Sequence, residues 1–332
     1  MTIKNILTLI AVLVIVGIFL FPHFQTKSTL EITPHISSEG FRVLPYDKQV
    51  EEMLKLADDN PEEAWNFLKE TFIINGNQTG NVHDLSHTVG NKAFQKFGIN
   101  GIKICDSSFA YGCFHGVTEE MLLTEGIAGL KSIENACGVA FPSKDMGYIS
   151  CIHGTGHGVY GVDGGDLKKA LLDCDIIEES YRQYCWDGVF MERSFSPENT
   201  VFDPKNPWKF CSDLDSWYQR NCARYHVQSF ISSTPSLNSV GKYCGRGSTQ
   251  ILQETCYESL GYHIAETSFG REAEIVNSCN KMPNKDGVEI CIMGGAKETV
   301  FQKYSGFETS GNALCQRLSI SRRFVCLSDI KT

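Results

Sequence analysis

The sequence lacks the short motifs that identify several large enzyme classes. It contains no Gly-x-x-x-x-Gly-Lys-Ser/Thr loop, no Gly-x-Ser-x-Gly turn, and no Cys-x-x-Cys or Cys-x-x-Cys-His segment. These absences argue against P-loop nucleotide binding, α/β-hydrolase chemistry, thioredoxin-like redox chemistry and c-type haem attachment. Basic residues are also scarce, with 30 Lys+Arg against 39 Asp+Glu and a net charge of −9. No nucleic-acid partner is therefore expected, because binding nucleic acid requires a basic face.

Cysteine is absent from the first hundred residues, which contain instead one long apolar run. Ile6–Phe21 is uncharged over 16 residues, follows Lys4 and is closed by Pro22. As a helix it would be about 24 Å long, slightly short of a bilayer core but longer than most signal-peptide cores. No small-x-small cleavage site follows it. We therefore expect an uncleaved transmembrane anchor rather than a removed signal peptide.

The anchor sets the expected topology and compartment. Residues 1–5 would be cytoplasmic, 6–22 transmembrane, 23–45 a spacer, and 46–331 an ectodomain in the extracytoplasmic space, with the membrane as the partner of the N-terminal helix. The chain has 14 cysteines, an even number, and all of them follow residue 100. Disulfides persist outside the cytoplasm, so the cysteine count and the anchor support the same localisation at the cell membrane.

The cysteines recur in pairs with a nearly constant period. The second members of the pairs follow one another at intervals of 38, 34, 37, 34, 35 and 35 residues. A period in the mid-thirties is typical of repeats built from two helices. The first cysteine closes a short helical segment, as in 166–174, and the second opens a longer one, as in 256–264. The simplest connectivity pairs the two cysteines of each hairpin, although the sequence permits others: Cys105–Cys113, Cys137–Cys151, Cys174–Cys185, Cys211–Cys222, Cys244–Cys256, Cys279–Cys291 and Cys315–Cys326.

One further unit precedes the disulfide series. Asn60 followed by Pro61 is a helix start, with Asn as the cap and Pro in the first turn, and residues 81–90 resemble a second helix without its cysteine. We therefore expect an all-α, right-handed repeat array (a solenoid) of about eight helical hairpins, mostly with one disulfide per hairpin, in addition to the transmembrane helix.

In period and helix pairing, residues 46–331 resemble the Sel1-like and tetratricopeptide-type repeats, particularly the cysteine-rich secreted ones. The resemblance implies a scaffolding or binding role, with a protein partner on the inner face of the repeats. It does not imply any particular activity.

Five of the nine histidines lie between residues 83 and 157, and they share a phase in the repeat. With Asn81 taken as the position of a missing cysteine, the residues two and six places after the second cysteine of each repeat form a potential ligand set. Its members are His83 and His87, His115 and Glu119, His153 and His157, and Asp187. Residues four apart share a helix face, and stacked repeats align equivalent faces. The His-rich first half, residues 81–194, is therefore expected to gather these side chains.

This set predicts a mono- or dinuclear metal centre on the inner helices. One group would be His83, His87 and His115; the other would be His153, His157 and Asp187, with Glu119 or His115 shared. Mixed imidazole and carboxylate ligands suit Zn, Fe or Mn, and an all-histidine set also suits Cu. Glu120 or Glu192 is expected as a positioning carboxylate or general base, and Glu120 is the candidate catalytic residue. The competing interpretation is a hydrogen-bonded polar inner face.

Glycines accompany the histidines in the same repeats. Gly116, Gly154 and Gly188 each stand three residues after the second cysteine. Glycine within a helix costs about 1 kcal/mol relative to alanine, so it usually marks the close approach of another helix or a ligand. Tight helix crossing is the simpler of the two interpretations.

Three functions remain open. The leading hypothesis is a metal-dependent extracytoplasmic enzyme, in which zinc would imply hydrolysis and iron or copper would imply oxidation. The second is a disulfide-stabilised scaffold for protein binding or assembly, without catalysis. The third is a metal storage or delivery protein.

Overall fold

Local sequence signals set the ends of several helices in the computed structural model, which describes residues 36–80, 82–195 and 202–331. Helix α4 (Pro61–Phe72) starts as predicted: the Asn60 side chain accepts a hydrogen bond from the Glu62 N–H, and Pro61 occupies the first turn. Asp145 caps α8 (Met146–Val162) in the same way. The predicted transmembrane segment and Asn81 lie outside the described residues.

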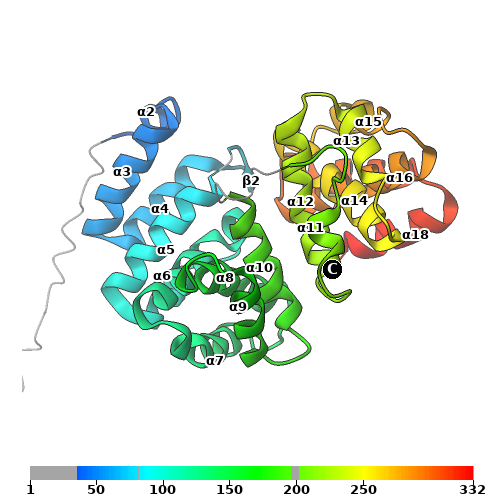
Figure 1. Cartoon of the computed structure of the whole chain (residues 1–332). Coiled ribbons are helices and arrows are strands. Elements are labelled where there is room, and N and C mark those ends of the chain that lie inside the picture. The colour runs from blue at the N-terminus through cyan, green and yellow to red at the C-terminus, as the bar shows by residue number, and fades with distance from the viewer. Residues whose placement is uncertain (1–35, 81, 196–201, 332) are drawn as a thin grey trace, which may run out of the picture. The chain divides into compact units, whose positions relative to one another are not determined.

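Long and short helices alternate along the chain (Figure 1). The first long helix is α5 (His83–Phe97), and the long helices that contain the second cysteine of a repeat are α6 (Gly112–Glu125), α8, α10 (Arg182–Phe195), α12 (Gln219–Ser233), α14 (Gln250–Ser268) and α16 (Lys285–Phe301). The shorter helices between them are α7 (Leu130–Ala140), α9 (Leu167–Asp173), α11 (Lys209–Ser212), α13 (Leu237–Cys244), α15 (Glu272–Cys279) and α17 (Phe307–Gln316), and α18 (Ile320–Asp329) follows α17. Ahead of α5 stand α2 (Ser38–Arg42), α3 (Tyr46–Asp59), α4 and a hairpin of β1 (Ile73–Ile74) with β2 (Asn77–Gln78). Short 3-10 segments occur at Gly98–Ile104, Ser108–Tyr111, Ile127–Gly129 and Cys174–Ile176. The described chain is therefore all-helical apart from one minimal hairpin.

Seven disulfides hold the helical hairpins together, and they join the same cysteine pairs that the simplest connectivity predicts. All 14 cysteines lie in the described residues and none is free. Cys105 is partly buried and the others are buried. Because each bridge closes a short loop, it contributes about 3 kcal/mol by restricting the unfolded chain.

The folded unit begins inside the segment that the sequence suggested as a spacer. Ser37 caps α2 by accepting a hydrogen bond from the Gly40 N–H, and Phe41 is fully buried. The Phe41 ring packs edge-to-face on Phe67 and Phe72, with centroids 5.3 and 6.1 Å apart. Helix α2 therefore belongs to the unit that starts at Ser37 rather than to a linker.

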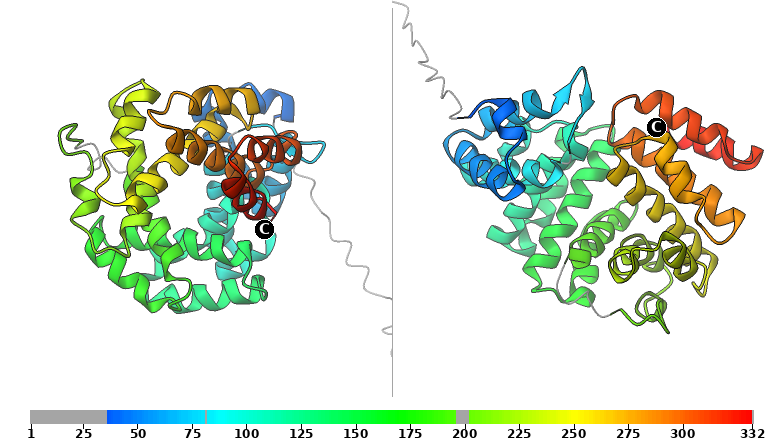
Figure 2. Two further views of the ribbon diagram at one scale, coloured as in Figure 1. Left: turned by 90° about the vertical axis from the view of Figure 1, so that its right-hand side faces the viewer. Right: turned by 90° about the horizontal axis from the view of Figure 1, so that it is seen from above.

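The long helices pack against one another in chain order, and the end of the array returns to its beginning. The Gln78 N–H donates to the Lys303 carbonyl at 3.3 Å, and Gln78 forms a bridge with Tyr304. The rings of Tyr111 and Phe301 lie 6.4 Å apart. Both views in Figure 2 show the C-terminal helices beside the segment that leads into α5 and α6. An open stack would leave the segment before α5 apart from the segment after α16, so these contacts close the array into a ring.

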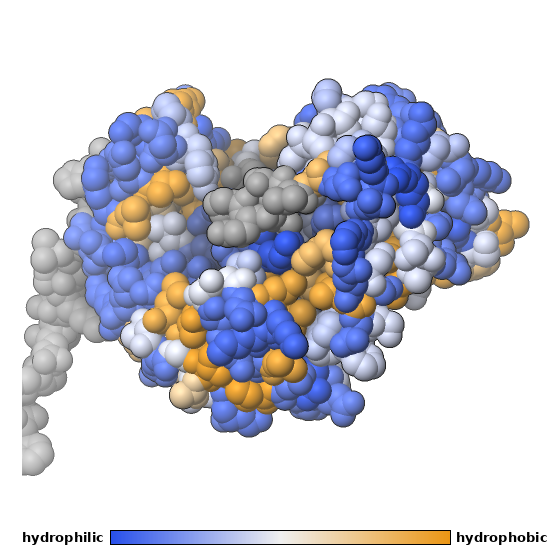
Figure 3. All heavy atoms as spheres, in the orientation of Figure 1, coloured by the Kyte–Doolittle hydropathy of each residue, from blue (hydrophilic) through white to orange (hydrophobic). Residues whose placement is uncertain are grey.

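The apolar core lies between the long and the short helices. Leu130 and Ile133 of α7 and Val240 of α13 are buried in one continuous cluster with Val117 of α6 and Val189 of α10. In Figure 3 the surface is mostly hydrophilic, with apolar side chains gathered around α7 and α10. Among the described residues, no helix combines the length and the apolar character needed to cross a membrane.

Candidate metal centre

Glycines allow α5 and α6 to cross at close range. A Cβ atom on Gly90 would lie 2.1 Å from the Cys113 carbonyl oxygen, and one on Gly116 would lie 2.2 Å from the His87 carbonyl oxygen. The next crossings are as close: a Cβ on Gly154 would lie 2.6 Å from the His115 Cα, and one on Gly188 would lie 2.0 Å from the His153 carbonyl oxygen. The predicted tight crossings are confirmed, and they bring the histidine-bearing backbones together.

Five imidazole rings from α5, α6 and α8 form one cluster. His115 of α6 stands between the two pairs, with ring centroids 5.2 and 5.3 Å from His83 and His87 and 5.3 and 5.8 Å from His153 and His157. His87 and His157 also approach each other directly, at 5.8 Å. Histidines of α5 and α8 therefore meet although α6 separates these helices in chain order.

The hydrogen bonds of His83 and His87 assign their tautomers. His83 Nδ1 lies 2.8 Å from the Phe109 carbonyl oxygen, which can only accept, so Nδ1 carries the proton. His87 Nδ1 lies 3.4 Å from the Glu119 carboxylate, which makes it a donor as well. The two Nε2 atoms face each other at 3.1 Å, and in the neutral rings both carry a lone pair. Two such lone pairs repel each other unless a proton or a metal ion lies between them.

The Phe109 carbonyl owes its position to an unusual turn. Phe109, Ala110 and Tyr111 have φ values of 54°, 52° and 62°, a left-handed conformation that side chains with a Cβ rarely adopt. The Phe109 ring, 2% exposed, packs edge-to-face on Trp65 and fixes the turn. Backbone strain of this kind costs about 1–3 kcal/mol per residue and is typical of functional sites. Here it directs a carbonyl oxygen at a histidine.

His115 completes a three-histidine group. One ligand atom from each of His83, His87 and His115 lies within 4.8 Å of the others, a spacing that could hold a metal ion. His115 is 4% exposed, and neither ring nitrogen has a hydrogen-bond partner among the described residues. An unpartnered buried imidazole costs about 1–3 kcal/mol per polar group, which a metal ion would offset.

Burial keeps three of the clustered histidines, His83, His115 and His153, neutral. Desolvation, and after it the charge of His87, lowers the pKa of His83 from 6.5 to about 3. Burial also holds the pKa of His115 and that of His153 well below 6.5, and neighbouring histidines lower both further. At neutral pH these rings therefore offer lone pairs, the form in which histidine binds metals.

The second pair, His153 and His157, lies on α8 next to α10. The two Nε2 atoms are 3.2 Å apart, and His157 Nδ1 lies 3.0 Å from the Glu192 carboxylate. His153 Nε2 also lies 3.3 Å from the Sδ atom of Met191. Sequence reasoning missed Met191, although it occupies the sixth position after Cys185 and so shares the phase of His157.

The structure gives the predicted carboxylates different positions. Asp187 accepts hydrogen bonds from Asn221, Arg224 and Tyr225 at 2.9, 2.8 and 3.3 Å, and its carboxylate lies 3.8 Å from His153 Nδ1. This arrangement satisfies Asp187 and leaves it beside the pair rather than among the ligand nitrogens. Glu119 meets His87 at Nδ1, the nitrogen turned away from His83.

Glu120 accepts a hydrogen bond from Gln95 Nε2 at 2.8 Å. Among the described residues its partner is thus an exposed amide rather than a histidine. Glu192, the alternative to Glu120 as the positioning carboxylate or general base, does contact the cluster, through His157.

Charged and phenolic side chains continue the inner face beyond the histidines. Arg224, two residues after Cys222, is 42% exposed and pairs with Asp187, and its guanidinium lies 5.2 Å from the Tyr262 ring centre. Lys297 pairs with Glu258 at 2.6 Å. These residues share the phase of the histidines, so the same periodicity predicts their placement.

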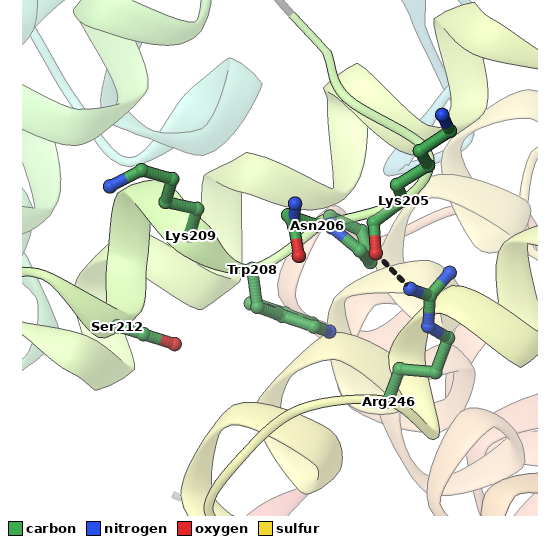
Figure 4. A pocket seen from close by; sticks show the side chains of 7 residues that line it. Lys205, Asn206, Trp208, Lys209, Ser212 and Arg246 are labelled. Atoms are coloured by element: carbon green, nitrogen blue, oxygen red, sulfur yellow. Dashed lines mark hydrogen bonds between the residues drawn. The ribbon is translucent and has the colours of Figure 1, made fainter.

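A separate surface cavity of about 430 Å³ lies beside α11 (Figure 4). Its lining includes Trp208, Ser212 and Arg246, and Arg246 donates to the backbone carbonyls of Pro204 and Lys205. The Lys205 and Lys209 side chains point away from each other. No histidine lines this cavity, so it is distinct from the metal centre.

Comparisons with family models, curated proteins and solved structures give no match.

Proposed function

We propose that the protein is a membrane-anchored, extracytoplasmic metal-dependent enzyme whose metal ion is bound by His83, His87 and His115. One observation carries the proposal: the His83 and His87 Nε2 atoms face each other at 3.1 Å, while each Nδ1 atom faces an oxygen acceptor. Two imidazole nitrogens bound to one tetrahedral metal at ordinary bond lengths are about 3.3 Å apart. The observed spacing is close to this value, and the oxygen acceptors at both Nδ1 atoms favour a ligand pair over a hydrogen bond between the rings.

The number of ligands supports catalysis rather than a closed structural site. Three protein ligands leave a coordination position for water or substrate, the usual pattern of catalytic zinc. Solvent reaches this side of the cluster, because the His87 and Glu119 side chains are 18% and 24% exposed. A bound zinc ion would supply a hydroxide for hydrolysis, whereas copper or iron would support oxidation.

This chain's own residues would orient the metal ligands and fix their protonation. The Phe109 carbonyl and the Glu119 carboxylate each accept a hydrogen bond from an Nδ1 atom, which directs the opposite nitrogen inward. The seven disulfides fit an oxidising compartment and hold the hairpins that carry the ligands.

The first experiment measures metal content. The full chain, purified in detergent with its disulfides intact, would be loaded separately with Zn²⁺, Cu²⁺, Fe²⁺ and Mn²⁺ and analysed by elemental mass spectrometry. The His83→Ala/His87→Ala variant should lose the metal of the three-histidine site, and the control His263→Gln, on α14, should keep it. A folded wild-type chain that stays metal-free would overturn the proposal and leave a binding scaffold.

A second measurement separates an enzyme from a storage protein. Co²⁺ in the three-histidine site should give a visible spectrum that shifts when azide is added, because azide occupies an open coordination position. A spectrum that azide does not change would show a closed site, and the enzyme proposal would then fail in favour of storage or delivery.

A further inference from the structure

The His153–His157 pair repeats the geometry of the first pair but adds a sulfur atom. His157 donates from Nδ1 to Glu192 at 3.0 Å, which leaves the lone pair on Nε2, 3.2 Å from His153 Nε2. The His157 side chain is 3% exposed, so water does not satisfy this lone pair. The pair lies on α8, whereas the first pair lies on α5.

Met191 reaches the same point from α10. Its Sδ atom lies 3.3 Å from His153 Nε2. An imidazole nitrogen and a sulfur bound to one tetrahedral metal are about 3.5 Å apart at ordinary bond lengths. A thioether is a weak hydrogen-bond acceptor but a good ligand for soft metal ions. The Met191 contact therefore has a clearer chemical reason with a metal present than without one.

His153 is not held in place by the neighbouring carboxylate. Its Nδ1 atom is 3.8 Å from Asp187, beyond hydrogen-bond range, and Asp187 is already bound by Asn221, Arg224 and Tyr225. A metal-free chain would place a proton on His153 Nε2 and share it with His157. With a metal ion bound, the Met191 sulfur is a ligand. Without one, the sulfur has no part in the contact between the two histidines.

His115 links the two pairs. Both of its nitrogens lack hydrogen-bond partners among the described residues, and its ring lies between the pairs. His115 therefore contacts both pairs, and one of its nitrogens belongs to the three-histidine group.

We propose that His153, His157 and Met191 form a second metal site, separate from the three-histidine site, which binds a soft cation of the Cu(I) class. The proposal does not depend on the enzymatic role of the first site. It assigns the two sites different chemical preferences: three imidazoles in one, and two imidazoles with a thioether in the other.

The test is anaerobic Cu(I) titration of the zinc-loaded full chain against a chromogenic Cu(I) chelator. The wild type should bind one Cu(I) without losing its zinc. Met191→Leu, which preserves volume and removes the sulfur, should weaken Cu(I) binding by at least about tenfold. Met293→Leu, two residues after Cys291 on α16, is the matched control and should leave Cu(I) binding unchanged.

X-ray absorption at the copper edge gives an independent measurement. The wild type should show a sulfur scatterer that Met191→Leu removes, and His153→Ala/His157→Ala should lose copper while retaining zinc. The proposal is overturned if the chain binds a single metal ion in all, or if Met191→Leu changes neither the affinity nor the sulfur scattering. Neither of these results would affect the metal at His83, His87 and His115.

Discussion

At the scale of single residues, the metal affinity of a histidine pair depends on the group that accepts a hydrogen bond from the Nδ1 atom. That acceptor directs the opposite nitrogen, Nε2, toward the other histidine of the pair. A backbone carbonyl serves His83, and the carboxylates of Glu119 and Glu192 serve His87 and His157. Groups that orient metal ligands in this way typically change metal affinity 10- to 100-fold when removed. The acceptors are therefore the residues whose mutation best distinguishes a metal site from a polar core.

The first prediction compares two adjacent glutamates of α6. Glu119→Ala should lower metal affinity at the three-histidine site by about 10- to 100-fold, because His87 loses its acceptor. Glu119→Gln, which keeps an oxygen acceptor, should recover part of the loss. Glu120→Ala should leave affinity unchanged, since Glu120 binds Gln95. Chelator competition measures all three, and equal losses at the two positions would contradict the assignment.

The second prediction concerns a carboxyl group in the other half of the ring. Burial, and then the charge of Glu298, raises the pKa of Glu266 from 4.5 to about 8, while Arg224 opposes the shift. Tyr304 is the further titratable group that senses Glu266. The folded chain thus holds this proton up to a higher pH than the unfolded chain does. The free energy of unfolding should consequently fall as the pH rises from about 4.5 to 8.

Glu266→Gln removes this titration. Relative to wild type, the variant should gain on the order of 2 kcal/mol at pH 9 and little at pH 4.5, as measured by urea unfolding. The exposed Glu308→Gln serves as the control and should differ from wild type equally at both pH values. A Glu266→Gln variant with no advantage at pH 9 would show that the fold does not raise the pKa of Glu266.

At the scale of helices, reciprocal glycines set the spacing of the long helices. A Cβ atom on Gly261 of α14 would lie 2.1 Å from the Cys291 carbonyl oxygen. A Cβ atom on Gly294 of α16 would lie 2.1 Å from the Glu258 carbonyl oxygen. The Gly90–Gly116 and Gly156–Gly188 pairs do the same nearer the histidines. Side chains at these positions would force the backbones apart.

The third prediction follows from this spacing. Gly261→Ala should lower the free energy of unfolding by about 3 kcal/mol, because the Cβ meets backbone that cannot move without separating α14 from α16. Gly138→Ala in α7, with open space around its Cβ, should instead gain about 0.5–1 kcal/mol. Urea unfolding of both variants provides the measurement. Similar stabilities for the two would contradict the role of the close crossing.

The sequence predicts helices and their partners well because both depend on local signals. The cysteine period predicts the hairpins, and Asn60 with Pro61 predicts the start of α4. The convergence of His83, His87 and His115 follows from the repeat phase. Met191 and Arg224 occupy the same repeat positions as the histidines, but a methionine and an arginine at helical spacing do not by themselves suggest a site. The left-handed turn at Phe109–Tyr111 could not be foreseen, since no glycine marks it.

At the scale of the folded unit, the closing contact is the feature that local sequence does not encode. Whether a repeat array stays open or closes depends on small rotations summed over every repeat. In this chain the sum brings the Gln78 backbone to Lys303, and Tyr304 is 3% exposed beside Phe269. The segments before α5 and after α16 therefore stabilise each other.

The fourth prediction tests the ring. Tyr304→Ala should speed amide hydrogen exchange both at residues 299–305 and at residues 72–80, because the two segments share one contact. Tyr243→Ala, which removes a ring packed on Phe202 and Phe230, should speed exchange near its own repeat and leave residues 72–80 protected. Unchanged exchange at residues 72–80 in Tyr304→Ala would show that the ends of the array behave independently.

The disulfides of the hairpins affect which residues of the chain can be substituted without loss of the fold. Five of the disulfides join a long helix to the short helix or turn before it, whereas the histidine cluster is built from residues two and six places beyond the second cysteine or its equivalent. Substituting those two residues leaves the bridge and the apolar layer intact. The ring is thus a modular framework for redesign, in which the inner pair of each repeat can be rewritten for a new ligand, one repeat at a time.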